Sequence, residues 1–234
     1  MNVSVVMATY NGKKYIRQQI ESVVKQLSVN DELLISDDGS SDGTKVIIQE
    51  YVNRYRNIKM IDGPGKGVIE NFSNAIPKLT KDIVFICDQD DIWHENKVEI
   101  IKKTFEEKEN INVVLHDAKV CDEDGNISSN ETIFEKRKAK HGILRNIIFT
   151  TYYGCCMALR REYAVSLLPF PKKVLYDQYI GNCAEVDRCT LFVTKALILH
   201  REHNKNWSKK QDLIDRIKIR VNMIKGIRYY LKGK

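Results

Sequence analysis

Apolar residues in the first 115 positions form short runs that alternate with apolar residues at helical spacing. The runs are rich in β-branched residues and stop at turn-forming residues, which predicts strands. Apolar residues three and four apart predict helices between them. Predicted strands are 3–8, 33–35, 58–61, 83–87 and 113–115, and predicted helices are 15–27, 47–55, a short one ending at Ile76, and 95–107. This alternation predicts an α/β fold, a mostly parallel sheet with helices on both faces.

The second half of the chain has a less regular pattern. Residues 122–142 are polar and charged, with a turn at 122–126, and we expect this segment to be flexible. Residues 151–159 are β-rich with one glycine, and 191–199 read as a strand. Helices are predicted at 176–187 and 211–231.

Polar residues follow three of the predicted strands. Thr9, Asp38 and the run Asp88-Gln89-Asp90-Asp91 each stand at or just after a strand end. Parallel strands end at one edge of a sheet, and ligands of such sheets bind outside that edge. We therefore expect these residues to gather there and to line a cleft.

The acidic run has two interpretations. Close carboxylates repel one another unless a cation neutralises them, and oxygen ligands suit Mg²⁺ or Mn²⁺. Equally, acidic residues ahead of Glu95 would fit the N-cap and first turn of the predicted helix. The position at a strand end, with apolar Ile92 and Trp93 directly after it, favours a site.

The segment 37–43 reads as a tight turn and an N-cap, above all at residues 40–42. Asp38 has a second use, because a carboxylate accepts the N3–H of a uracil or thymine ring. Thr9 and Tyr10 are placed to support the same base by hydrogen bonding and packing. The glycine-rich segment 63–67 lacks the patterns of known phosphate loops, and we interpret it first as a turn.

Composition limits the classes of protein. A chain of 234 residues with 43% hydrophobic and 29% charged residues suits one α/β domain. No apolar run is long enough to span a bilayer and the start lacks a secretion signal, so we expect a cytoplasmic protein. Its six cysteines lack zinc spacing and read as reduced structural thiols. Despite the net charge of +7, nothing indicates a nucleic-acid module.

Basic residues concentrate in the predicted C-terminal helix, where an apolar series repeats every three or four residues. The series is Leu213, Ile214, Ile217, Val221, Ile224, Ile227 and Leu231. One interpretation is a helix packed on the domain through these residues. The other is a basic amphipathic helix 209–234 that contacts an anionic membrane peripherally.

Several segments together resemble family 2 glycosyltransferases with the GT-A fold. In the first half these are VVMATYNG, ISDDGSSDGT and FICDQDDIW. In the second half they are TYYGCCMAL around Gly154, YDQY around Asp177, and the "Arg-x-His-x-x-Asn-x-Ser" pattern at 201–208. The similarity runs from residue 1 to about 208 in the family's order. The acidic run is similar to that of rhamnosyltransferases in the family.

The resemblance implies a single GT-A catalytic domain at 1–208. Its Rossmann-like, mostly parallel sheet would carry a nucleotide-sugar-binding half at 1–115, followed by an acceptor and catalytic half at 116–208. The resemblance makes Asp177 the catalytic base and Asp90 the metal ligand, with His203 as a second metal ligand. A lone histidine is also commonly structural. The nucleotide-sugar-binding candidates are Thr9, Tyr10, Asp38, Asn71, Asp88 and Asp91.

The implied reaction is an inverting transfer of a sugar from a UDP- or dTDP-linked donor, with Mn²⁺ or Mg²⁺, in surface polysaccharide synthesis. The acceptor would be a glycan or a lipid-linked saccharide, and Asp177 would take the proton of its hydroxyl group. Without the resemblance, Asp177 reads as a surface or capping acid. Gln178 stands where the family commonly has Trp, which predicts a differently shaped acceptor wall.

Two alternatives compete with this function. A sugar-nucleotide nucleotidyltransferase would also combine an α/β fold with an acidic metal site, but the segment after the first strand lacks a basic glycine-rich loop. A non-catalytic nucleotide-sugar-binding module is the other alternative. The retained set of Asp38, Asp90 and Asp177 argues against it.

Overall fold

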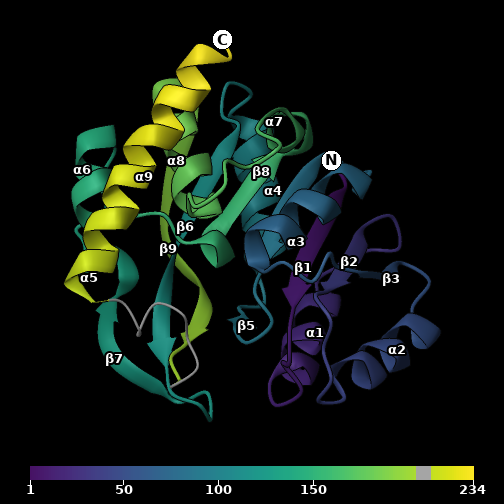
Figure 1. The fold of residues 1–234 in the computed structure, drawn as a ribbon. Helices are drawn as coiled ribbons and strands as arrows, with labels where there is room; N and C mark the ends of the chain where they lie inside the picture. The colour runs from purple at the N-terminus through teal and green to yellow at the C-terminus, as the bar shows by residue number, and fades with distance from the viewer. Residues whose placement is uncertain (204–211) are drawn as a thin grey trace.

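A computed structural model of the chain describes residues 1–203 and 212–234. Its strands form one nine-stranded sheet within those residues, in the order β3-β2-β1-β4-β8-β6-β9-β5, with β7 paired to β6. The strands are β1 (Val3–Thr9), β2 (Glu32–Asp37), β3 (Ile58–Asp62), β4 (Ile83–Cys87), β5 (Ile92–Trp93), β6 (Val113–Cys121), β7 (Ile127–Thr132), β8 (Met157–Arg160) and β9 (Thr190–Arg201). Figure 1 shows this sheet running through the molecule with helices around it.

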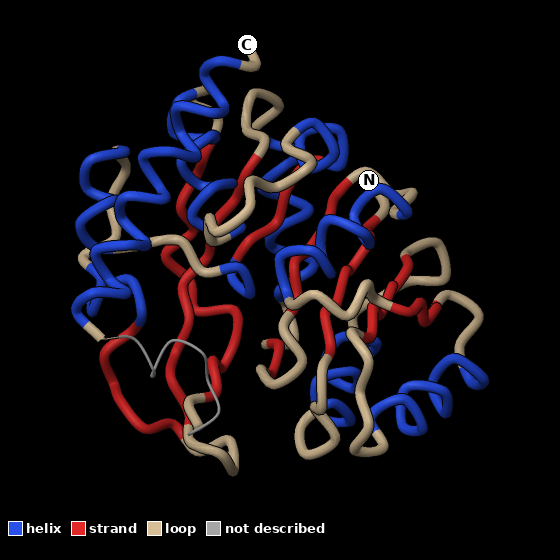
Figure 2. Tube along the Cα trace, viewed as in Figure 1, coloured by secondary structure: helices blue, strands red, loops and turns tan. Residues whose placement is uncertain are grey.

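Helices connect most of these strands (Figure 2). The longer ones are α1 (Ile16–Val24), α2 (Thr44–Arg54), α3 (Val68–Ala75), α4 (Lys97–Glu107), α8 (Tyr176–Val186) and α9 (Leu213–Lys232). The shorter ones are α5 (Ile133–Arg137), α6 (Ile143–Phe149) and α7 (Arg161–Ser166), with 3-10 turns η1 (Ile76–Lys78) and η2 (Gly154–Cys156). The predicted α/β fold is therefore confirmed.

The predicted parallel sheet is present in the first half and becomes mixed in the second. Strands β3, β2, β1 and β4 are mutually parallel. Strand β8 runs antiparallel to both β4 and β6, whereas β6 and β9 are parallel to each other. Strands β1, β2 and β4 are almost entirely buried, because they are covered on both faces, and this explains the apolar runs 5–8, 33–35 and 83–87.

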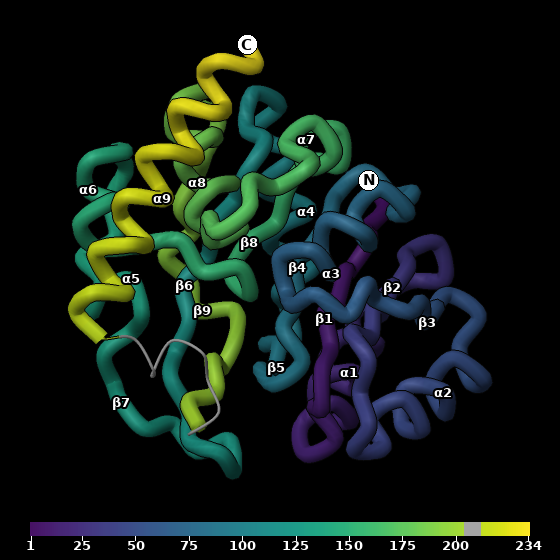
Figure 3. The backbone as a smooth tube through the Cα atoms, in the orientation of Figure 1, coloured from purple at the N-terminus to yellow at the C-terminus, as the bar shows by residue number. Residues whose placement is uncertain are grey.

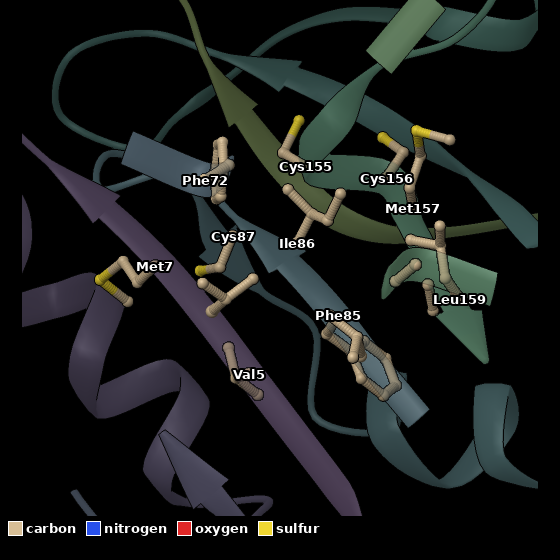
Figure 4. Close-up of a cluster of buried hydrophobic side chains, with 14 of the residues drawn as sticks. Val5, Met7, Phe72, Phe85, Ile86, Cys87, Cys155, Cys156, Met157 and Leu159 are labelled. Carbon is tan, nitrogen blue, oxygen red and sulfur yellow. The ribbon is translucent and has the colours of Figure 1, made fainter. Parts of the chain in front are cut away.

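The core continues from the parallel strands into the antiparallel strand β8. Figure 4 shows Val5 and Met7 of β1, Phe85 and Ile86 of β4, and Met157 of β8 among the side chains of one buried cluster. The two halves therefore share one hydrophobic core.

The prediction of a flexible segment at 122–142 was wrong. The structure forms β7 there, although its residues are mostly exposed, and then α5. Strand β6 continues to Cys121 and supplies backbone partners to β7, so pairing rather than apolar burial defines this strand. A reciprocal capping box between Thr132 and Glu135 starts α5.

Two other boundaries differ from the prediction. Within the β-rich segment 151–159, only the part from Met157 onward is strand, since Gly154–Cys156 forms a 3-10 turn. The helix expected from Glu95 begins at Lys97. The turn at 63–67 agrees with its interpretation, and Gly65 and Gly67 have positive φ angles of 68° and 93°.

The C-terminal helix α9 packs on the domain, lying against α8 and α6 (Figures 1 and 3). The residues that pack are not the predicted apolar series, because the helix buries Met223 and Gly226. Most of the series is exposed instead. Among the described residues, none of the helices combines the length and apolar composition needed to cross a bilayer.

Candidate functional site

Sheet register brings the three polar strand ends together. Thr9 of β1 pairs with Asp37 of β2, and Met7 of β1 pairs with Cys87 of β4. Asp38 and Asp88 directly follow β2 and β4. The predicted gathering at the carboxyl edge of the parallel strands is therefore confirmed.

Asp37, which the sequence analysis did not select, organises the turn after β2. Its buried carboxylate accepts hydrogen bonds from Thr9 Oγ1 (2.9 Å), Ser40 Oγ (2.6 Å) and the Ser40 backbone N–H (2.8 Å). Thr9 is thereby held to Asp37 and is itself buried, with 2% exposure. Its hydroxyl group acts as a support for the turn.

Asp38 lies at the surface of the same turn and bonds to the glycine-rich loop. Its two carboxylate oxygens accept the backbone N–H groups of Gly65 (2.8 Å) and Gly67 (2.7 Å). Each oxygen keeps a further lone pair. A pyrimidine N3–H can therefore be accepted without breaking these bonds.

Asn71 of α3 is buried and fully engaged with β2. Its Oδ1 accepts Ser36 Oγ at 2.5 Å and its Nδ2 donates to the Ser36 carbonyl at 2.8 Å. A Cβ atom built on Gly63 would lie 2.6 Å from Asn71 Oδ1 and 2.8 Å from Asp38 Oδ1. Asn71 thus packs against Gly63, at the start of the 63–67 loop whose backbone binds Asp38.

Tyr10 is tied to the acidic run through its backbone. The Gln89 side-chain amide accepts the Tyr10 N–H at 2.9 Å and donates to the Tyr10 carbonyl at 3.1 Å. The Tyr10 side chain is 58% exposed. It is therefore available to pack against a planar ring.

The acidic run does not cap a helix. Strand β5 follows it directly, and α4 begins only at Lys97 with Asn96 as its N-cap residue. Burial, together with the neighbouring carboxylates of Asp91 and Asp90, raises the pKa of Asp88 to about 8. A cluster this crowded with negative charge favours a bound cation.

Asp90 and His203, 113 positions apart in the sequence, meet at this edge. His203 Nε2 lies 2.9 Å from Asp90 Oδ2, and its ring stacks on Tyr15 with the ring centroids 5.0 Å apart. Both Asp90 and His203 are largely shielded from solvent. A carboxylate oxygen and an imidazole nitrogen form a donor pair that suits Mn²⁺. Asn206 and Ser208 of the same motif lie outside the described residues.

Asp91 forms a buried ion pair with His200. Asp91 Oδ1 is 2.9 Å from His200 Nδ1 and accepts the Arg201 backbone N–H at 3.2 Å. Burial lowers the pKa of His200, but the Asp91 carboxylate outweighs burial and raises it well above its ordinary value. Burial raises the pKa of Asp91, and His200 brings it below the ordinary value.

Cys155 adds a third donor atom to this pair. The donor atoms of Asp91, Cys155 and His200 lie within 4.8 Å of one another, a distance that a metal ion can bridge. However, the Asp91 carboxylate is fully buried, whereas the Asp90 carboxylate keeps 17% exposure and stays accessible to an ion. We therefore assign this trio to positioning the acidic run and look to Asp90 and His203 for the cation.

Arg201, at the end of β9, holds several segments at once. Its guanidinium group donates to the carbonyl of Asp90 (2.8 Å) and to Gln18 Oε1 (2.7 Å). It also donates to the carbonyls of Asp122 and Glu123 and lies 4.9 Å above the Tyr15 ring. This buried side chain fixes the acidic run against the first helix and the loop after β6.

Asp177 lies in the first turn of α8 and accepts the Gln178 backbone N–H at 2.6 Å. Burial raises the pKa of Asp177 to about 6, and the backbone N–H groups of Gln178 and Gly154 partly offset this rise. The negative charge of Asp177 also raises the pKa of Asp88, so the two carboxylates interact electrostatically. Gln178 is buried and donates to the Tyr152 carbonyl.

Sequence reasoning missed the residues that hold the site together: Tyr15, Asp37, Gln89, His200 and Arg201. A signal existed for Arg201, since it opens the motif at 201–208, and charged residues at the end of an apolar strand indicate a buried partner. The role of Gln89 carries no such signal. It depends on the distance between two loops that are 79 positions apart.

Comparison with known proteins identifies the relatives of this chain. The profile of glycosyl transferase family 2 matches residues 4–168. An uncharacterized glycosyltransferase of Nostoc sp. is 26% identical over 202 residues, which cover 83% of this chain and 61% of that protein. The Escherichia coli glucosyltransferase WfgD, which acts on a GlcNAc-diphosphoundecaprenol, is 35% identical over 99 residues. These residues cover 42% of this chain and 38% of WfgD. The chain thus spans less than two thirds of the length of these relatives.

Solved structures share the fold. The S. aureus protein TarS, residues 1–349 in complex with UDP-GlcNAc, superposes with a TM-score of 0.68 at 18% identity, over 99% of this chain and 72% of that one. The Pyrobaculum calidifontis mannosyltransferase PcManGT, in complex with GDP-Man and Mn²⁺, superposes with a TM-score of 0.65 at 15% identity. The superposition covers 97% of this chain and 68% of PcManGT. The fold is GT-A, as the sequence predicted. With a family profile covering most of its length, the chain belongs to glycosyl transferase family 2.

Proposed function

We propose that this chain transfers a sugar from a UDP- or dTDP-linked donor to a glycan or lipid-linked saccharide, with inversion at the anomeric carbon. The observation that carries the proposal is the meeting of Asp38 and the acidic run at one edge of the sheet, with the Asp177 carboxylate of α8 acting electrostatically on Asp88. The relatives support a role in surface polysaccharide synthesis, since WfgD builds on a lipid diphosphate.

We assign residues 1–115 to donor binding. Asp38 accepts the N3–H of the pyrimidine, with Thr9 holding the turn and Tyr10 packing on the ring. Asn71 supports the Asp38 loop from below. The Asp38 carboxylate is compatible with uracil or thymine, because both rings donate at N3, whereas the N3 of cytosine has no hydrogen to donate.

Asp90 and His203 would hold the divalent cation, Mn²⁺ or Mg²⁺. The Asp90 carboxylate oxygen suits either ion, the His203 nitrogen suits Mn²⁺ better than Mg²⁺, and the adjacent Asp88 and Asp91 carboxylates add negative charge that a cation would neutralise. When bound, the ion supplies positive charge to the departing diphosphate. Asp88 borders the ribose. The buried Asp91, which His200 keeps ionised, positions the acidic run rather than contacting the sugar.

We assign residues 116–208 to the acceptor, with Asp177 as the general base. An acceptor hydroxyl loses its proton to the Asp177 carboxylate as its oxygen attacks the face of the sugar opposite the diphosphate. A new glycosidic bond forms as the bond to phosphate breaks. Attack from the opposite face gives the inverted anomer.

A test of donor binding uses thermal unfolding with UDP-, dTDP- and GDP-sugars, with and without Mn²⁺. We expect a pyrimidine nucleotide sugar to raise the melting temperature only with Mn²⁺, and Asp90→Asn to remove that increase. Glu109→Gln, an exposed acid on another loop, is the control and should behave as wild type.

Transfer is tested by following release of the free nucleoside diphosphate with saccharide acceptors. Binding without any release would indicate a non-catalytic module. The proposal fails if none of the donors binds and Asp90→Asn leaves the protein unchanged. Family membership already argues against a nucleotidyltransferase.

A further inference from the structure

Helix α9 has two apolar faces, and only one of them packs on the protein. The inner face contains Met223 and Gly226, which are buried. A Cβ atom at Gly226 would lie 3.1 Å from Val174 and 3.3 Å from the Tyr179 ring of α8, so the two helices are in close contact there. Asn222 Nδ2 also donates to the Lys173 carbonyl at 2.9 Å.

The opposite face is apolar and open to solvent. At about 100° per residue, Ile217 lies roughly 180° from Gly226 around the helix. The exposed residues near Ile217 form a row, defined here as the outer row. Its members and their exposed fractions are Leu213 (73%), Ile214 (61%), Ile217 (55%), Val221 (44%), Ile224 (40%) and Leu231 (53%).

Basic residues border the outer row, and Arg228 lies within it, roughly 20° from Ile217 around the helix. The helix carries Arg216, Lys218, Arg220, Lys225, Arg228 and Lys232, against Asp215 as its acidic residue. Solvent exposes nearly all of them. Their long side chains are able to place a cation beside the row while their methylene stems lie along it.

Helix α6 lies beside α9 and also exposes apolar residues. It packs on both α8 and α9, and Arg220 of α9 donates to the Ile148 carbonyl at 2.9 Å. Asn146 of α6 is buried and bonds to Asn182 of α8, whereas Leu144 (79%) and Ile148 (59%) are exposed. Both helices therefore direct buried residues to α8 and apolar residues away from it. The basic segment Lys136–Lys140 leads into α6.

We propose that the outer row and the exposed residues of α6 form a surface that binds an anionic lipid bilayer. Leucine and isoleucine side chains would enter the boundary between headgroups and acyl chains, and the flanking lysines and arginines would bind the phosphates. Charge complementarity selects this partner, because an apolar row bordered by cations on one exposed helix matches an anionic lipid surface. The helix lies on the bilayer and stays packed on α8.

The test is sedimentation of the full chain with vesicles of phosphatidylglycerol and phosphatidylcholine in equal parts, or of phosphatidylcholine alone. We expect binding to the anionic vesicles that weakens as salt increases. Ile217→Ser combined with Ile224→Ser should lower the partition coefficient by roughly tenfold or more. The matched control combines Val29→Ser with Val46→Ser, exposed apolar residues (91% and 67%) elsewhere on the chain.

Both double variants should keep the wild-type unfolding midpoint and nucleotide-dependent stabilisation, which separates this proposal from the proposed catalysis. Equal vesicle binding by the two double variants would overturn the lipid surface. A full chain that does not bind the anionic vesicles would overturn it as well. A dimer in sedimentation velocity that the Ile217/Ile224 variant alone abolishes would identify a second copy as the partner instead.

Discussion

Asp177 is a carboxyl group whose surroundings oppose its charge. Burial raises its pKa to about 6, from an ordinary value of 3.8. Such a shift keeps the group ionised at neutral pH while leaving it a stronger base than an exposed aspartate. A base with this pKa suits the deprotonation of a sugar hydroxyl.

The shift predicts opposite effects of Asp177→Asn on activity and on stability. Because the folded pKa is above the unfolded one, ionisation of Asp177 opposes folding as the pH rises from 3.8 to about 6. Asn has no such cost and still accepts the Gln178 N–H. We therefore expect the variant to gain stability relative to wild type across that interval and to hold the gain above it, in urea unfolding at several pH values.

For the same variant, we expect transfer to fall by about 10²- to 10⁴-fold. The wild-type rate should rise with pH through an acid limb near pH 6, set by the pKa of Asp177. Full activity in Asp177→Asn would remove this residue as the base. An acid limb that persists unchanged in the variant's residual rate would assign the titration to another group.

At the scale of single residues, the sequence predicted the strand-end positions better than their partners. Thr9, Asp38 and Asp88 follow from the rule that parallel strands end at one edge. The partner of Asp91 does not follow, because His200 is 109 positions away and reaches it only after β9 returns beside β5. Local patterns contain no information on such a distant contact.

At the scale of elements, the contact between η2 and α8 controls where Asp177 lies. Gly154 faces the Tyr176 side chain so closely that a Cβ atom would be 2.0 Å from Tyr176 Oη and 2.7 Å from Cζ. The Tyr176 ring packs on Phe72 (4.7 Å between centroids) and Phe170 (6.1 Å), so it has little room to move. Tyr176 directly precedes Asp177 at the start of α8.

Gly154→Ala should therefore displace the start of α8. We expect a destabilisation of about 1–3 kcal/mol from overpacking, measured by urea unfolding, together with a lower rate of transfer. Stabilisation by the donor and Mn²⁺ should change less, because Asp38 and Asp90 lie on other elements. Gly233→Ala, where the nearest atom would be 3.6 Å away, is the control. Wild-type transfer by Gly154→Ala would contradict this role.

Periodicity predicted the central elements because their apolar residues are buried on the faces that the pattern indicates. It failed for β7, whose strand rests on backbone pairing with β6 rather than on apolar alternation. For α9 it predicted the helix and left open whether the apolar series packs on the domain, which most of that series does not do. Ile217 and Ile224 repeat at helical spacing, yet they point to solvent, while the small residue Gly226 makes the close contact with α8.

At the scale of the whole molecule, Arg201 joins the two proposed halves. It is the last residue of β9 in the second half and binds the Asp90 carbonyl and Gln18 in the first. A buried guanidinium group offers five donors in a planar fork, and here they reach several segments at once. Because the same residue's backbone N–H binds Asp91, the position of the acidic run depends on the end of β9.

Arg201→Lys keeps the charge but replaces the fork with one ammonium group, which cannot reach all of these acceptors. We expect a loss of about 2–4 kcal/mol in the free energy of unfolding, because buried carbonyl and amide oxygens lose charged donors. Stabilisation by Mn²⁺ and the donor should fall as well, since Asp90 and Asp91 lose their alignment. Arg54→Lys is the matched control: Arg54 lies 5.3 Å above the Tyr55 ring, as Arg201 lies 4.9 Å above Tyr15, but it is exposed. If both variants unfold with free energies within about 0.5 kcal/mol of wild type, Arg201 does not couple the halves.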